Sequence, residues 1–242
     1  MVSKKFSAST KRQIRKEAGY GCCRCGSEII QYHHINPNFN KVEDGMALCP
    51  GCHDMATRGA MTLYEQLEFK NNPYNIVHGY SKGKLIINPG TIPFLFIGHN
   101  TISPSENIIT VNGESLLGIN INDDGFIALS LKLYNENDDL VMEILDNEWI
   151  SGDFLAWDIE VSYKWIKIRP KKRKIILDIR IDGIIKIKAD LWRRGSNIKL
   201  SPEKLEIIGN DGNIKFSTDH FCGVLLENFG FNINENGEFF LG

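Results

Sequence analysis

The chain has 242 residues, of which 42% are apolar and 24% are charged, the balance of an ordinary globular protein. This composition excludes a disordered chain, a collagen-like chain and a long coiled coil. The most apolar stretch, residues 92–98, is far shorter than the roughly 20 residues that a membrane-spanning helix needs. Because the N-terminal residues lack the apolar core of a secretion signal, we expect a cytoplasmic protein with no membrane partner.

Charge is unevenly distributed along the chain. The formal net charge is only −2, yet residues 106–160 hold 13 acidic residues against one basic residue. Residues 161–200 hold 13 basic residues against 3 acidic residues. A surface this polarised can attract a charged partner such as nucleic acid even when the average charge is near zero.

The N-terminal part predicts a small region of mixed secondary structure. Residues 8–18 predict a short basic helix. Residues 29–35 mix β-branched and aromatic side chains and predict a strand, which is followed by a loop over 37–45. We expect a second helix from His53 onward and a third helix over 63–70, just before the Asn71-Asn72-Pro73 breaker.

From residue 74 onward the pattern changes to short apolar runs separated by turn signals such as Asn112-Gly113 and Asp182-Gly183. Runs that alternate apolar with polar residues between such turns are typical of an all-β domain. We expect an antiparallel β-sandwich or barrel here, with a β-solenoid as the alternative because the Ile-rich runs resemble one another. The whole chain is therefore predicted as α+β, with one domain at 1–73 and a β-rich domain at 74–242.

Cysteine spacing predicts a metal site. Five of the six cysteines fall between residues 22 and 52, in a chain without a secretion signal, which argues against a disulfide framework. Two C-x2-C pairs separated by 23 residues are a strong signal for a structural zinc with four thiolate ligands, Cys22, Cys25, Cys49 and Cys52. Cys23 is interpreted as a bystander.

Three histidines lie close to this predicted zinc site. His33 and His34 are adjacent on the predicted strand, so they point to opposite faces and cannot serve one site in the same way. His53 follows the last predicted zinc ligand, which restricts its position. One of the adjacent pair can bind a metal while the other faces a substrate; the alternative is a set of ordinary surface histidines.

The run His33-His34-Ile35-x-Pro37, then Leu48-Cys49-x-x-Cys52-His53, with Cys22-x-x-Cys25-Gly26 upstream, resembles the HNH nucleases of the ββα-metal, or His-Me finger, group. The resemblance covers about residues 9–70. It implies that His34 is the general base, that His33 and His53 hold a catalytic Mg²⁺ or Mn²⁺, and that the zinc knuckles brace the finger. The family usually has Asn where this chain has Asp44, and Asn36, Asn38 and Asn40 are nearby substitutes.

Two groups of basic residues are candidates for contacts with nucleic acid. The first lies on the predicted N-terminal helix and comprises Lys11, Arg12, Arg15 and Lys16; the alternative is a solvated helix face. The second belongs to the run 164–174, which has seven basic residues in eleven and includes Lys171, Lys172 and Arg173. That run can equally form ion pairs with the acidic block at 106–160.

Taken together, these patterns predict a metal-dependent HNH endonuclease that hydrolyses DNA. The β-rich domain would target or regulate it, in a setting such as restriction or anti-phage defence, and could also carry a homodimer contact or bind a partner protein. The alternative is a zinc-stabilised nucleic-acid-binding or scaffold protein whose HNH site is weak or inactive, a reading that Asp44 favours.

Overall fold

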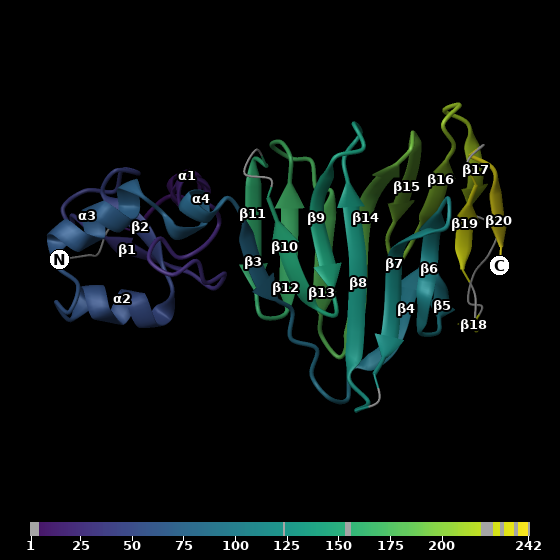
Figure 1. Ribbon diagram of the computed structural model, residues 1–242, viewed down its shortest axis with the longest axis horizontal. Coiled ribbons are helices and arrows are strands. Elements are labelled where there is room, and N and C mark those ends of the chain that lie inside the picture. Colours follow the sequence, from purple (N-terminus) through teal and green to yellow (C-terminus); the bar gives the residue numbers. More distant parts are fainter. Residues whose placement is uncertain are drawn as a thin grey trace. The chain divides into compact units, whose positions relative to one another are not determined.

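The computed structural model describes residues 5–122, 124–152, 156–218, 225–227, 230–234 and 237–241 (Figure 1). It divides into two compact units. The first comprises Met1–Gly83, Ile150–Ser162 and Arg169–Lys172, and the second comprises Lys84–Trp149, Tyr163–Ile168 and Arg173–Gly242. The first unit thus continues past residue 73 and includes two segments from much later in the chain. The division into domains at 1–73 and 74–242, with the β-rich part as a separate folding unit, stays a prediction.

The first unit is a ββα region flanked by helices. Its elements are α1 (Ala8–Glu17), β1 (Gln31–His34), β2 (Gly45–Leu48), α2 (Pro50–Thr57), α3 (Leu63–Asn71) and α4 (Tyr74–His78). The Ser7 hydroxyl accepts the N–H of Thr10 and begins α1, and Thr62 with Glu65 forms a capping box at the start of α3. Such caps satisfy backbone N–H groups that have no partner inside the helix.

One expectation for this unit needs correction, and one helix was missed. Helix α2 begins at Pro50 rather than at His53, because proline suits the first helical position and the Cys49 sulfur accepts the N–H of Cys52 there. Helix α4, which lies just beyond the expected breaker, was not predicted. It starts after Pro73 and ends at Gly79, whose left-handed φ of 76° stops the helix.

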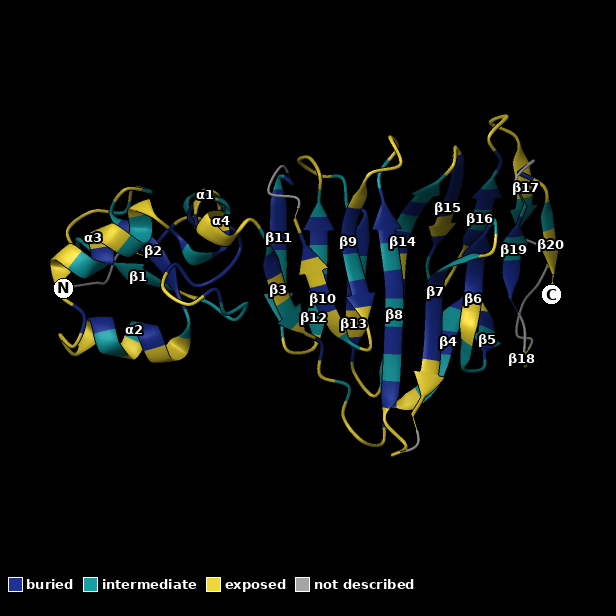
Figure 2. Cartoon of the chain, viewed as in Figure 1, coloured by how far each residue is buried: buried dark blue, intermediate teal, exposed yellow. Residues whose placement is uncertain are grey.

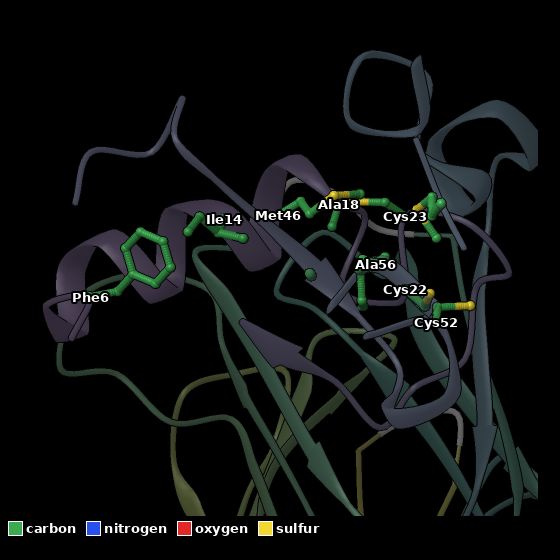
Figure 3. Packing of buried hydrophobic residues seen from close by; sticks show 11 residues of the cluster. Phe6, Ile14, Ala18, Cys22, Cys23, Met46, Cys52 and Ala56 are labelled. Atoms are coloured by element: carbon green, nitrogen blue, oxygen red, sulfur yellow. The ribbon is translucent and has the colours of Figure 1, made fainter. Parts of the chain in front are cut away.

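Strands β1 and β2 form an antiparallel hairpin in which His33 pairs with Met46 and His34 pairs with Gly45. The first unit also contains a small apolar cluster that includes residues of β2, shown in Figure 3. It comprises Phe6, Ile14, Ala18, Cys22, Cys23, Met46, Ala47, Leu48, Cys52, Ala56 and Met61. A core this small gives limited stability by itself, which is the usual reason for a metal in a region of this size.

A segment from far along the chain completes the first unit. Strand β11 (Asp158–Ser162) contacts α1, and the Asp158 carboxylate binds the Arg15 guanidinium at 2.7 Å. The Tyr20 hydroxyl donates to the carbonyl of Ala156, and the Arg12 guanidinium lies 4.4 Å from the ring centroid of Trp157. Helix α1 is therefore held by residues about 140 positions later.

The second unit consists of two large open sheets. One contains β6 (Ser105–Val111), β7 (Glu114–Ile121), β8 (Ile127–Tyr134), β9 (Leu140–Leu145), β19 (Phe231–Ile233) and β20 (Phe239–Leu241), in the order β20-β19-β6-β7-β8-β9. The other contains β12 (Trp165–Arg169), β13 (Leu177–Ile181), β14 (Ile184–Arg193), β15 (Ser196–Leu200), β16 (Leu205–Ile208) and β17 (Ile214–Ser217), hydrogen-bonded in chain order. Consecutive strands in each sheet pair as antiparallel hairpins.

Three short strands extend the second sheet from β14. They are β4 (Ile92–Ile97), β5 (Asn100–Ile102) and β18 (Leu225–Leu226). Strand β4 pairs with β14 in parallel, and β5 pairs with β4 and with β18. The remaining strands, β3 (Ser81–Lys84) and β10 (Glu148–Ser151), contain two of the points at which the chain passes between the units.

The two sheets pack against each other, with β8 contacting β14 (Figure 1). Alternate residues of β8 are buried, which appears as dark bands along that strand in Figure 2. Strand β14 alternates in the same way, and its inward residues are Ile185, Ile187, Ala189 and Leu191. The α+β class is thus confirmed, and over the described residues the β-rich part forms open sheets rather than a closed barrel or a solenoid. Within the described ranges, no helix is both long enough and apolar enough to cross a membrane.

Candidate metal centre and active site

Four thiols converge at the junction of the first knuckle with β2 and α2. The sulfur atoms of Cys22, Cys25, Cys49 and Cys52 all lie within 4.8 Å of one another. The Cys25 sulfur is 3.8 Å from that of Cys49 and 4.0 Å from that of Cys52. Four zinc–sulfur bonds of about 2.3 Å in a tetrahedron place the sulfurs about 3.8 Å apart. The cluster therefore has the residue type, number and spacing that a structural zinc requires.

The surroundings of the thiols also suit a cation. Burial raises the pKa of the Cys22 and Cys25 thiols, so four thiolates need a positive charge among them. Part of that charge comes from Arg24, whose Nη1 lies 3.7 Å from the Cys52 sulfur. The contact with Cys52 raises the pKa of Arg24. Because its guanidinium lies so close to a ligand sulfur, Arg24 offsets part of the negative charge of the thiolate cluster.

Cys23 is the one other cysteine among the described residues, and it is not part of this cluster. Cys23 is buried in the apolar cluster, where burial raises the pKa of its thiol to about 11. Its backbone N–H donates to the carbonyl of Ala47 and so joins the first knuckle to β2. Its interpretation as a bystander agrees with this position. Cys222 lies outside the described residues.

Beside the thiol cluster, the structure brings His33 of β1 and His53 of α2 together. Their ring centroids are 5.2 Å apart, and the ring planes are nearly perpendicular at 85°. Since bonds between a metal and an imidazole nitrogen are about 2.1 Å long, one ion can bind a nitrogen of each ring at this spacing. Burial, and then the facing His53, lower the pKa of His33, which favours the neutral form that ligates metals.

A glutamine from α3 orients His33. The amide nitrogen of Gln66 donates to the carbonyl of Met61 at 3.1 Å, so its Oε1 faces His33 Nε2, also at 3.1 Å. An oxygen acceptor there requires that Nε2 carries the proton, which leaves Nδ1 as the lone-pair nitrogen. A hydrogen bond to the second ring nitrogen is the usual way in which a protein orients a metal-binding histidine. Gln66 is 8% exposed, so its position is well restrained.

His34 has a separate environment, as expected for the next residue on a strand. Its Nε2 is 2.9 Å from the Oδ1 atom of Asn40, in the loop between β1 and β2. Its ring stacks on Phe6, with centroids 3.9 Å apart and planes within 10°. His34 is partly exposed, so it retains a route to solvent.

Asp44 closes the loop that carries Asn40. Its carbonyl accepts the N–H of Ile35 at 2.8 Å, and its carboxylate accepts the N–H of Lys41 at 3.2 Å. Lys70 of α3 donates to the carbonyls of Val42 and Gly45, which fixes the end of the same loop. Asp44 therefore holds the loop, whereas Asn40 contacts the histidine.

The predicted basic residues of α1 differ in their availability. Arg15 is engaged inside the protein by Asp158 and by the Tyr32 hydroxyl, so a phosphate would compete with both. Arg12 lies over Trp157, and the Lys11 ammonium lies 5.2 Å from the ring centroid of Tyr32. Within the described part of the chain, neither of these two side chains forms an ion pair, and neither does Lys16.

The basic run at 164–174 divides in the same way. Arg169 pairs with Asp158 and Glu160, and Lys174 pairs with Glu136, so part of the run does join the acidic block. In contrast, the side chains at 171–173 are exposed and have no ion pair within the described part of the chain. These three, Lys171, Lys172 and Arg173, remain candidates for phosphate contacts.

Sequence patterns did not single out several residues that surround the histidines. Gln66 lies 33 residues after His33, and Phe6 lies before α1, so no local motif connects either to the site. Asn40 had been one of three nearby asparagines, with nothing to choose among them. Comparison of the chain with family models, with curated proteins and with solved structures finds no match. A function must therefore be argued from the site.

Proposed function

We propose that this chain is a metal-dependent HNH endonuclease that hydrolyses phosphodiester bonds of DNA. The observation that carries the proposal is the pairing of His33 with His53 on a ββα unit, with His34 held separately beside them. The thiol cluster supports it, because zinc held by Cys22, Cys25, Cys49 and Cys52 would join the first knuckle to the junction of β2 and α2, next to these histidines.

In this proposal His33 and His53 hold a divalent ion, Mg²⁺ or Mn²⁺. When bound, such an ion acts as a Lewis acid that stabilises the charge developing on the phosphate. The lone pair of His33 is available for this because Gln66 occupies the other ring nitrogen. Two protein ligands leave most of the coordination positions for water and phosphate, which suits a hard cation.

His34 is the proposed general base. With Asn40 Oδ1 as the acceptor at Nε2, the neutral ring has its lone pair on Nδ1. A neutral imidazole can take a proton from water at pH 7. His34 would therefore remove the proton from the attacking water and later release it to solvent.

Contacts with DNA are proposed for the basic side chains that remain unpaired. On α1 these are Lys11, Arg12 and Lys16, and later in the chain they are the three side chains at 171–173. Phosphate contacts from such residues position the backbone without reading the sequence. The two-sheet unit would then target or regulate the nuclease, through a partner protein or a second copy, in restriction or anti-phage defence.

The second candidate function is a zinc-stabilised nucleic-acid-binding or scaffold protein that does not cut. Asp44 favours it, since the resemblance calls for asparagine at that position. The contact between Asn40 and His34 weakens this candidate, because an amide is still directed at the histidine.

Cleavage of plasmid DNA in Mg²⁺, in Mn²⁺ and in EDTA distinguishes the two. The full chain should cut in either metal and not in EDTA. His34→Ala should lose about 10²–10⁴-fold in rate, the usual range for a general base, with zinc content and DNA affinity retained. His33→Ala and His53→Ala remove metal ligands, so raised Mn²⁺ should restore part of their activity.

His78→Ala is the matched control, because His78 is an exposed histidine of the same unit that stacks on Tyr74. It should cut at the wild-type rate. Wild-type protein that binds DNA without cutting it in either metal would favour the second candidate. If metal rescues His34→Ala and not His33→Ala, the two roles are exchanged.

A further inference from the structure

The His34 ring is restrained from two directions by residues outside the motif that contains it. Phe6, in the segment before α1, stacks on one face of the imidazole, with centroids 3.9 Å apart and an interplanar angle of 10°. Asn40 approaches in the plane of the ring, with Oδ1 2.9 Å from Nε2. Among the described residues, the hydrogen bond of the His34 ring is made at Nε2, and its stacking partner is Phe6.

The stacked position of Phe6 depends on the residue opposite His34 in the hairpin. Gly45 pairs with His34 in the register of β1 and β2. A Cβ atom at Gly45 would lie 2.5 Å from Phe6 Cζ and 2.8 Å from Ile14 Cδ1, far inside contact distance. The Phe6 ring therefore occupies the space that a side chain at Gly45 would need. Phe6 is 5% exposed, so its ring is a fixed surface.

The two contacts restrain different motions. Stacking fixes the plane of the imidazole, but a ring turned by 180° about χ2 stacks equally well. The hydrogen bond removes that ambiguity, because Oδ1 accepts only from a protonated ring nitrogen. It also selects the tautomer with the proton on Nε2. Together they leave one orientation of the ring, in which Nδ1 is the unprotonated nitrogen.

We propose that Phe6 and Asn40 are positioning residues for His34: Phe6 sets the plane of the imidazole, and Asn40 sets its rotation and tautomer. Their role as positioning residues of a base rests on the proposed nuclease function. Their effect on the orientation of the His34 ring is independent of that function, because the contacts exist in the protein without substrate. Residues that orient a catalytic group typically change activity by about 10–100-fold when they are removed.

The test combines ¹⁵N NMR of the histidine rings with cleavage kinetics on the full-length protein. In the wild type, the His34 signals should show one neutral tautomer, protonated at Nε2. Asn40→Ala should give a mixture of tautomers and lower kcat by about 10–100-fold, with KM for DNA unchanged. Phe6→Leu should keep the tautomer, because Asn40 is intact, but lower kcat similarly. Zinc content, measured on each variant, verifies that the first unit is folded.

The chain offers a matched control for each substitution. Asn38 lies in the same loop and is exposed, and Phe39 is 53% exposed. Asn38→Ala and Phe39→Leu should change neither the tautomer nor kcat. A wild-type His34 protonated at Nδ1, or an unaltered tautomer in Asn40→Ala, overturns the proposal whether or not DNA is cut. The expected tautomers in a protein that cuts no DNA would support the orientation of the ring and overturn the nuclease.

Discussion

Replacing Asp158 by Asn tests the attachment of the later segment to α1. The carboxylate of Asp158 accepts hydrogen bonds from Arg15 Nη2 at 2.7 and 2.9 Å and from Nε at 3.1 Å. The two side chains are only 4% and 14% exposed, so solvent screens the pair weakly. Burial raises the pKa of Asp158 even though Arg15 acts to lower it. Desolvation therefore offsets much of the attraction between the two charges.

This balance sets the expected magnitude. An intact buried pair contributes little, but removing one partner leaves the other charge buried and uncompensated, which costs about 3–5 kcal/mol. We expect Asp158→Asn to lower the free energy of unfolding by about that amount. The double variant Arg15→Met/Asp158→Leu should recover most of the loss, because both buried charges are gone and apolar groups fill the space.

The assay is urea unfolding, followed by tryptophan fluorescence and by circular dichroism. The control is Asp54→Asn, whose partner Arg58 forms an exposed pair with side chains 77% and 59% exposed. Such a pair contributes about 0–1 kcal/mol. An Asp158→Asn variant that loses no more stability than Asp54→Asn would contradict this expectation. So would a double variant whose loss equals the summed losses of Arg15→Met and Asp158→Leu measured singly.

Three further predictions concern other parts of the chain. Elemental analysis should find one tightly bound zinc per chain, and Cys49→Ser should lose both the zinc and the fold of the first unit; a normally folded, zinc-free variant contradicts this. Alanine at all three positions of 171–173 should weaken DNA binding and flatten its salt dependence by about one unit of slope per lost contact, so an unchanged slope removes these residues from the interface. The last prediction concerns Glu114. Burial acts to raise the pKa of this carboxyl group, but hydrogen bonds from Lys132, Tyr134 and Arg193 outweigh burial and lower the pKa from its ordinary 4.5 to about 2. The stability that this ionised carboxylate adds is complete above about pH 4.5 and is lost as the pH falls toward 2, so Glu114→Gln should flatten the acid side of the stability profile.

Local sequence was enough to predict the four-thiol cluster. The two C-x2-C pairs place their sulfurs close together because each knuckle is a tight turn whose geometry depends on only a few residues. The strand that carries His33 and His34 was predicted for the same reason, as was most of α3. The alternating runs after residue 74 likewise predicted antiparallel strands, because burial of one sheet face imposes a period of two, but they left sandwich, barrel and solenoid open.

Only the tertiary structure decided which distant residues surround those local motifs. That Asn40 rather than Asn36 or Asn38 faces His34 depends on the path of a loop that Asp44 and Lys70 hold closed. That Arg15 is an internal partner of Asp158, and not a free basic group, depends on a contact 143 residues apart. Composition and spacing contain no information about such pairings, because a buried ion pair is selected by geometry and desolvation once the chain has folded. Local spacing thus specifies the chemistry available around the two knuckles, whereas the folded chain specifies which side chains orient it.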